Sequence, residues 1–99
     1  MPKIIFEINY NIHPEKREQY LSMINDLRKS IKETSNNNYL VFENKKIKNN
    51  FTEMYICESE EEFDALEDNQ SEETIELTQK LFNDLIKDNK VNYTTKYEV

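Results

Sequence analysis

The sequence contains no glycine and no tryptophan, and it has one cysteine and two prolines. Without glycine the chain lacks the loops that let a backbone wrap a phosphate or a dinucleotide, which excludes Walker-type and Rossmann-type nucleotide sites. Turns have to use asparagine instead, because asparagine tolerates a positive φ better than most residues. Asparagines stand where turns are expected, at Asn36–Asn38, Asn49, Asn50, Asn69 and Asn89.

Metal-ligating residues are equally scarce. Cys57 has no second cysteine to form an internal disulfide, and one cysteine with one histidine excludes a structural zinc site. The acidic run from Glu58 to Asp68 lacks calcium-loop spacing, so we interpret it as a solvated surface with some acids favourably placed at a helix start. We therefore expect neither a metal nor another cofactor.

The formal net charge is −7, and this excess of acid disfavours nucleic acid and anionic membranes as partners. The densest basic stretch, Lys45, Lys46 and Lys48, is short and is interpreted as a solvated turn. No apolar run approaches the roughly 18 residues of a membrane span, and no signal-peptide pattern is present. These features predict a soluble cytoplasmic protein.

A chain of 99 residues without a composition break predicts a single domain over residues 1–99. Such a chain buries about two-thirds of its unfolded surface in one core. A core of this size often completes its burial by pairing with a second copy, so we expect a homodimer.

The hydrophobic period changes along the chain in the order strand, helix, strand, strand, helix, strand. The expected elements are a strand over Ile4–Ile12, a helix from Pro14 to about Glu33, strands over Tyr39–Glu43 and Phe51–Cys57, a short helix from Ser59, a helix from Ser71 to about Asp88, and a strand over Val91–Val99. This order is the split βαβ pattern of an α+β, ferredoxin-like domain, whose antiparallel sheet carries its helices on one face. The first and third strands are expected at the centre of the sheet.

Two elements are expected to contact something beyond their own sheet. The helix beginning at Ser71 spreads its apolar residues over an arc of roughly 180°, wider than one sheet requires, so we expect something else to cover it as well. The last strand alternates regularly between its two faces and is expected at a sheet edge. The unpaired backbone groups of such an edge can hydrogen-bond to a strand of another chain.

Two segments carry a resemblance to a known family. The junction from Ile12 to Leu21, with His13-Pro14 at its centre, and the segment Phe51 to Leu66 resemble the corresponding parts of the antibiotic biosynthesis monooxygenase-like group of dimeric α+β barrel proteins. The resemblance implies a homodimer whose two sheets face each other in a barrel. It also implies a pocket between each sheet and its helices.

The chain departs from that group at chemically important positions. Members often carry a tryptophan where this chain has Cys57, and a histidine where it has Asp68-Asn69-Gln70. The haem-degrading branch uses an asparagine, a tryptophan and a helical histidine. Because this chain lacks the tryptophan and the helical histidine, haem degradation is disfavoured.

Several side chains are candidates for a site. His13 is the default general base because its unperturbed pKa lies near neutrality, although the alternative is that it caps the first helix. Cys57 is a candidate nucleophile or a small buried hydrophobe. Tyrosine hydroxyls on strands can line a pocket or simply pack. The ligand-binding candidates are Tyr10, His13, Tyr55, Cys57 and Tyr93.

Two functions remain open. The first is a structural or small-ligand-binding dimer without catalysis, whose ligand would be a small apolar or aromatic molecule. The second, which the resemblance implies, is a cofactor-independent monooxygenase-like enzyme acting on a small aromatic or polyketide-like molecule. An apolar pocket lined by His13 or several tyrosine hydroxyls favours the second, and a filled interior favours the first.

Overall fold

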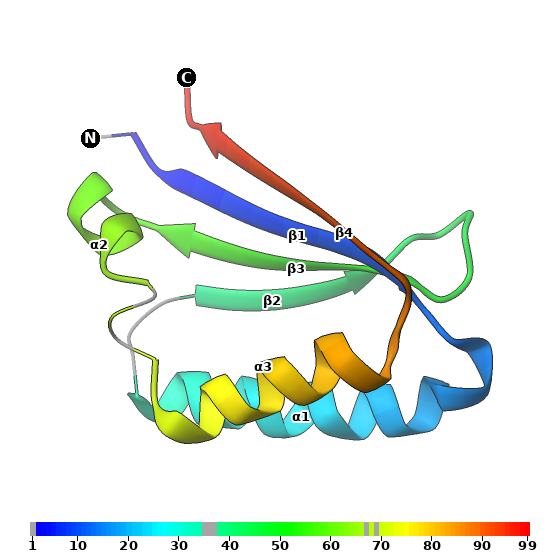
Figure 1. Cartoon of the computed structure of the whole chain (residues 1–99). Coiled ribbons are helices and arrows are strands. Elements are labelled where there is room, and N and C mark those ends of the chain that lie inside the picture. The colour runs from blue at the N-terminus through cyan, green and yellow to red at the C-terminus, as the bar shows by residue number, and fades with distance from the viewer. Residues whose placement is uncertain (1, 35–37, 67, 69) are drawn as a thin grey trace.

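The structure is a computed structural model that describes residues 2–34, 38–66, 68 and 70–99. Its elements are β1 (Ile4–Ile12), the 3-10 turn η1 (Pro14–Lys16), α1 (Arg17–Thr34), β2 (Asn38–Glu43), β3 (Asn50–Cys57), α2 (Glu60–Asp64), α3 (Glu72–Asp84) and β4 (Ile86–Tyr97) (Figure 1). The predicted order of elements is confirmed. The turns expected at Asn36, Asn37 and Asn69 lie outside the described residues. Asn38 and Asn50, also expected in turns, are instead the first residues of β2 and β3.

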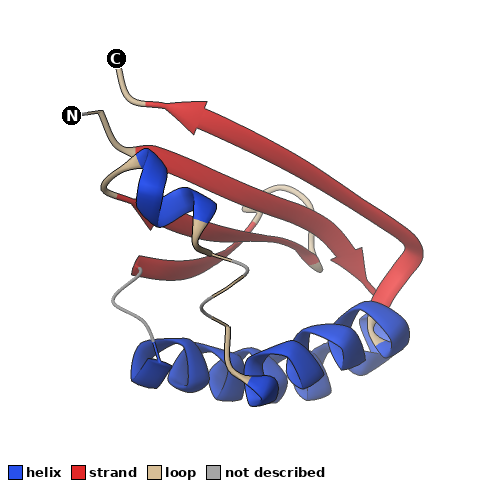
Figure 2. Cartoon of the chain, turned by 60° about the vertical axis from the view of Figure 1, so that its left-hand side comes forward, coloured by secondary structure: helices blue, strands red, loops and turns tan. Residues whose placement is uncertain are grey.

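The four strands form one antiparallel sheet in the order β2-β3-β1-β4. As predicted, β1 and β3 are central and β2 and β4 are the edges. Helices α1 and α3 lie side by side across one face of this sheet, and the short α2 follows the end of β3 (Figures 1 and 2). The α+β, ferredoxin-like fold class is therefore confirmed. No helix of the described part of the chain is long and apolar enough to cross a membrane.

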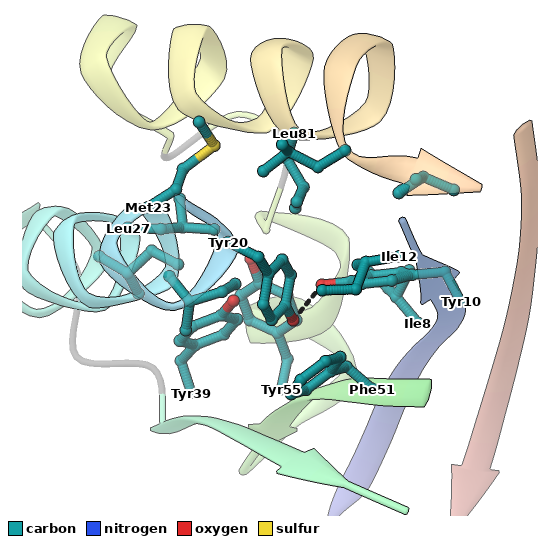
Figure 3. Close-up of a cluster of buried hydrophobic side chains, with 14 residues drawn as sticks. Ile8, Tyr10, Ile12, Tyr20, Met23, Leu27, Tyr39, Phe51, Tyr55 and Leu81 are labelled. Atoms are coloured by element: carbon teal, nitrogen blue, oxygen red, sulfur yellow. Dashed lines mark hydrogen bonds between the residues drawn. The ribbon is translucent and has the colours of Figure 1, made fainter. Parts of the chain in front are cut away.

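The core lies between the sheet and α1 and α3 (Figure 3). From β1 it takes the alternating residues predicted to face inward, of which Phe6 alone is only half buried. From α1 it takes the predicted helical stripe, and every member of that stripe is buried: Tyr20, Met23, Ile24, Leu27 and Ile31. Burying large apolar side chains at these two periods is what holds the helix layer on the sheet.

The loop between β2 and β3 forms without glycine. Asn49 adopts a positive φ of 65°, which confirms its predicted role as a turn residue. The Arg17 guanidinium donates two hydrogen bonds to the Glu43 carboxylate, and the Asn49 backbone N–H donates a third. These bonds lower the pKa of Glu43 to about 2. The loop is thus tied to the start of α1 by a charge-assisted contact.

The boundary between α3 and β4 differs from the prediction. The helix was expected to continue to about Asp88 and the strand to begin at Val91, but α3 ends at Asp84 and β4 begins at Ile86. The reason is tertiary pairing, because Ile86 pairs with Ile12 and the His13 N–H donates to the Leu85 carbonyl at 3.0 Å. Contacts with the end of β1 therefore hold Leu85 and Ile86 outside the helix, although their local sequence pattern favours helix.

This boundary narrows the predicted apolar arc of α3 only slightly. Leu85 and Ile86 lie outside the helix, but Leu77 and Ile75, which lie near the two ends of the arc, remain in it. Helix α1 packs beside α3, and the two helices are joined by a buried hydrogen bond of 2.7 Å between the Ser30 and Thr74 hydroxyls. Ile75 of α3 stays 39% exposed, so the cover expected for the apolar arc is only partly supplied within the described chain. The Ser71 side chain caps the start of α3 by accepting from the Thr74 N–H at 3.1 Å.

A large bulge interrupts β4. Between its pairs Tyr10↔Val91 and Ile12↔Ile86, β1 has one residue and β4 has the four residues 87–90. The chain accommodates the excess by placing Asp88 and Asn89 at positive φ, 60° and 52°. The expected turn at Asn89 is therefore present, as a bulge inside the strand rather than a connection before it.

Substitutions at Asn89 test this account. Alanine cannot occupy the left-handed region without strain, so Asn89→Ala should lower the free energy of unfolding by about 1 kcal/mol. Asn89→Gly should leave it nearly unchanged, because glycine adopts positive φ freely. Urea denaturation measures both. The control is Asn92→Ala in the regular part of β4, and an equal loss at both asparagines would contradict a conformational role for Asn89.

Candidate functional site

A pocket of about 370 Å³ opens between the sheet and α3. Its deep side consists of the buried residues Ile8, Glu53 and Tyr55, from the two central strands. Its remaining walls come from β1, β4, α3 and the segment between α2 and α3, and are Phe6, Tyr93, Thr78, Phe82, Leu66 and Gln70. A largely apolar pocket of this size with a few polar groups is typical of a small-molecule site.

One wall of the pocket is aromatic and is centred on Phe6. The Phe6 ring stacks on Tyr93, with centroids 5.9 Å apart and planes 12° from parallel. Tyr55 lies 6.4 Å from it in a tilted arrangement, and Phe63 contacts it edge-on at 6.0 Å. Three of these rings, Phe6, Tyr55 and Tyr93, line the pocket, and aromatic side chains favour contacts with another aromatic ring.

The polar group on the deep side is the Glu53 carboxyl, whose residue is only 3% exposed. The Tyr10 hydroxyl donates to Oε2 at 2.7 Å, and the Tyr39 hydroxyl donates to Oε1 at 2.5 Å. The Tyr10 hydroxyl oxygen also lies 2.8 Å from the Tyr20 hydroxyl oxygen, in the hydrogen bond that is dashed in Figure 3. Since Tyr10 gives its single proton to Glu53, Tyr20 is the donor in that contact.

Strand alternation explains how these groups meet. Glu53 opposes Ile8 of β1 and Val41 of β2, which places it on the helix-facing side of the sheet. Tyr10 and Tyr39 reach it from the two neighbouring strands. Four elements, β1, β2, β3 and α1, thus contribute to one network of hydroxyls around a single carboxyl.

Burial dominates the electrostatics of this network. It raises the pKa of Glu53, although the hydrogen bonds from Tyr39 and Tyr10 oppose the rise by favouring the charged form. Burial also raises the pKa of Tyr10, Tyr39 and Tyr20. The three tyrosines therefore stay protonated near neutral pH and remain available as donors to the carboxyl.

Glu53 was not among the residues singled out from the sequence. The signal was present, because the alternation that places Tyr55 and Cys57 on one face of the third strand places Glu53 on the same face. It is the one charged side chain among the inward positions of that strand. A charged residue at an inward position of a central strand is a stronger functional indication than the tyrosines around it.

The structure brings together part of the predicted site. Tyr55 and Tyr93 both line the pocket. Tyr10 lies behind the pocket surface, where it holds Glu53. Of the two tyrosines in the pocket, Tyr55 is buried and Tyr93 is 58% exposed, so Tyr93 forms part of the rim.

His13 lies elsewhere, at the junction of β1 and η1, and is not among the residues that line the pocket. It occupies the N-cap position of η1, yet its side chain makes no capping hydrogen bond. Its Nδ1 lies 3.9 Å from an oxygen of Glu15. The backbone of His13 is what ties the layers together here, by donating to Leu85.

Cys57 is a free, fully buried thiol at the end of β3 and does not line the pocket. Burial raises its pKa, and the negative charge of Glu62 adds to the rise. A protonated, inaccessible thiol behaves as a small apolar side chain. Within the described residues, no group of three or more His, Cys, Asp or Glu side chains could hold a metal ion.

No protein-family model and no curated protein sequence matches the chain. Solved structures do match it. A conserved protein from Methanosarcina mazei Go1 superposes with a TM-score of 0.82 at 15% identity, covering 100% of this chain and 95% of that one. A candidate antibiotic biosynthesis monooxygenase from Nitrosomonas europaea superposes with a TM-score of 0.78 at 6% identity, covering 95% and 88%.

An antibiotic biosynthesis monooxygenase also superposes, with a TM-score of 0.68 at 18% identity, covering 100% of this chain and 97% of that one. The chain therefore has the fold of the antibiotic biosynthesis monooxygenase-like group, as the resemblance predicted. At these identities the likeness concerns the fold, and function has to be argued from the pocket itself.

The pKa shift of Glu53 predicts a pH dependence of stability. Because folding raises this pKa, the folded protein binds the proton more tightly than the unfolded chain. The contribution of Glu53 to stability is therefore greatest at acidic pH and falls as the pH rises from about 4 through the raised folded value. Glu53→Gln cannot titrate, so the free energy of unfolding of the wild type should fall relative to this variant as the pH rises.

Urea denaturation at a series of pH values measures the difference. Glu76→Gln, which removes an exposed acid from α3, is the control and should follow the wild-type pH profile. Parallel profiles for the wild type and Glu53→Gln would show that Glu53 titrates in the folded protein as it does in the unfolded chain.

Proposed function

We propose that this protein is a homodimer that binds a small aromatic ligand in the pocket between the sheet and α3. The observation that carries the proposal is the pocket itself, which combines an aromatic wall with one buried carboxyl. A purely structural domain is expected to fill its interior, because an unfilled apolar cavity forfeits packing contacts. The open pocket therefore favours ligand binding over a structural role alone.

The homodimer is supported by the face of the sheet that carries neither α1 nor α3. Alternation places Leu40 and Phe42 of β2 on this open face, where they are 43% and 51% exposed. Met54 and Ile56 of the neighbouring β3 share the face and are half buried. Together these four side chains form an apolar stripe along one edge of the open face.

A second copy is the occupant that we propose for this stripe. On the neighbouring β1, Ile5 stands opposite Ile56 and extends the apolar surface. Farther along β1 the open face is polar and already internally paired: Glu7 pairs with Lys96, and Asn9 donates to Asn50 and Thr52. An apolar stripe beside satisfied polar groups is self-complementary when two copies face each other about a two-fold axis. The barrel-like arrangement that the resemblance implies uses this face.

Phe42→Lys tests the dimer. The wild type should sediment at twice the chain mass of 12.0 kDa, and Phe42→Lys should shift it toward the monomer because it places a charge in the apolar stripe. Analytical ultracentrifugation measures the mass. Ile47→Lys, at a position 55% exposed in the β2–β3 loop, is the control and should remain dimeric. A monomeric wild type would contradict the proposal.

A monooxygenase-like enzyme acting on a small aromatic or polyketide-like molecule is the second candidate. The observation that favours it is Glu53, because a buried carboxyl with a raised pKa at a pocket surface is suited to take a proton from a phenolic substrate. Oxygen uptake with a dihydroxynaphthalene tests it. Uptake by the wild type that Glu53→Gln abolishes would favour the enzyme, and uptake at the buffer rate would count against it.

A filled-pocket variant tests ligand binding directly. The wild type should bind 2-naphthylmethanol, a neutral aromatic probe, with amide shifts in two-dimensional NMR at Phe6, Tyr55 and Phe82. Thr78→Trp places an indole in the pocket and should weaken binding by about tenfold or more. Isothermal titration calorimetry measures the affinities.

The matched control is Ile75→Trp on the same helix, at a position 39% exposed that does not line the pocket. It should bind the probe as the wild type does. Equal affinity in both tryptophan variants would place the probe outside the pocket and contradict the proposal.

A further inference from the structure

The charge environment of Glu53 is unusual for a buried acid. Buried carboxylates are normally paired with a cation, because the cost of desolvation is otherwise uncompensated. All thirteen lysines and arginines lie within the described residues, and none forms an ion pair with Glu53. The partners of Glu53 there are the neutral hydroxyls of Tyr10 and Tyr39.

The hydrogen bonds leave room for a further donor. A carboxylate has about four acceptor sites, two on each oxygen. Tyr10 occupies one site on Oε2 and Tyr39 one site on Oε1. Because Glu53 also lines the pocket, a donor on a bound ligand can use one of the remaining acceptor sites. The two tyrosines hold the carboxylate in a fixed orientation for that contact.

The rest of the pocket favours positive charge on the ligand. None of the described residues that line it is basic, and the chain carries a net charge of −7. Phe6 and Tyr93 both line the pocket, and aromatic rings attract a cation that lies over a ring face. An aromatic group with an attached ammonium would place its ring on this wall and its charge toward Glu53.

We infer that Glu53 is a recognition residue for a cationic ligand, and that the pocket selects small aromatic amines over neutral or acidic aromatic molecules. This inference rests on the proposed ligand-binding function and specifies its ligand class. A protonated amine supplies the missing positive partner, so it recovers part of the cost of burying the carboxylate. A neutral alcohol donates a hydrogen bond without the charge, and a carboxylate is repelled.

Three probes with one ring system test this selectivity on the full chain: 2-naphthylmethylamine, 2-naphthylmethanol and 2-naphthoate. Titration calorimetry near neutral pH should show the amine binding about tenfold or more tightly than the alcohol, and no binding of the naphthoate. Equal affinities for amine and alcohol, or a preference for the naphthoate, would overturn the inference.

Glu53→Gln assigns the selectivity to this residue. The variant keeps the side-chain shape and an acceptor oxygen but removes the charge. Its affinity for the amine should therefore fall about tenfold to hundredfold, while its affinity for the alcohol should change little. Glu76→Gln removes one exposed charge from α3 and should leave both affinities unchanged. Amine binding that survives in Glu53→Gln would overturn the inference.

Gln70→Lys gives a second variant that leaves the buried network intact. Gln70 lines the pocket and is half buried. A lysine there adds a positive charge, so it should weaken binding of the amine and leave binding of the alcohol unchanged. Binding of the alcohol distinguishes a failure of amine selectivity from a failure of ligand binding itself. If the alcohol binds without any preference for the amine, the ligand-binding function stands and the inference fails, and if no probe binds, both fail.

Discussion

The hydrogen-bonded carboxyl of Glu53 is the constraint on which the centre of the molecule depends. Tyr10 and Tyr39 donate to its two oxygens from the strands on either side, and Tyr20 extends the network to α1. A buried polar network of this kind is favourable only when every member is satisfied. It therefore fixes the relative positions of β1, β2, β3 and α1, and it places one polar group at the deep side of an otherwise largely apolar pocket.

The absence of glycine shapes the periphery in a comparable way. Asn49, Asp88 and Asn89 adopt the left-handed conformations that glycine commonly occupies. At Asn49 the turn is further held by Glu43, whose carboxylate accepts from Arg17 and from the turn backbone. The bulge at residues 87–90 lets β4 pair with both ends of β1, and this pairing brings Tyr93 to the rim of the pocket.

Fold and function separate clearly in this protein. The superpositions on antibiotic biosynthesis monooxygenase-like proteins concern the backbone. The tryptophan often found in that group is absent from this chain, and the polar centre of its pocket is a carboxyl. In this chain the layered backbone leaves a pocket between the sheet and α3. The chemistry of the pocket depends on side chains at alternate strand positions, and these can change without altering the fold.

The sequence alone determined the class and order of the elements, the central strands and the inward faces of β1 and α1, because these depend on local periodicity. It also indicated turn positions such as Asn49 and Asn89, where the absence of glycine left few alternatives. Tertiary structure alone decided where α3 ends, since pairing of Ile86 with Ile12 competes with the helix there. It also decided the site: Tyr55 and Tyr93 meet in one pocket while His13 and Cys57 lie outside it, and Glu53 gains its partners from strands distant in sequence. Periodicity assigns a side chain to a face, but only register and packing assign it a neighbour.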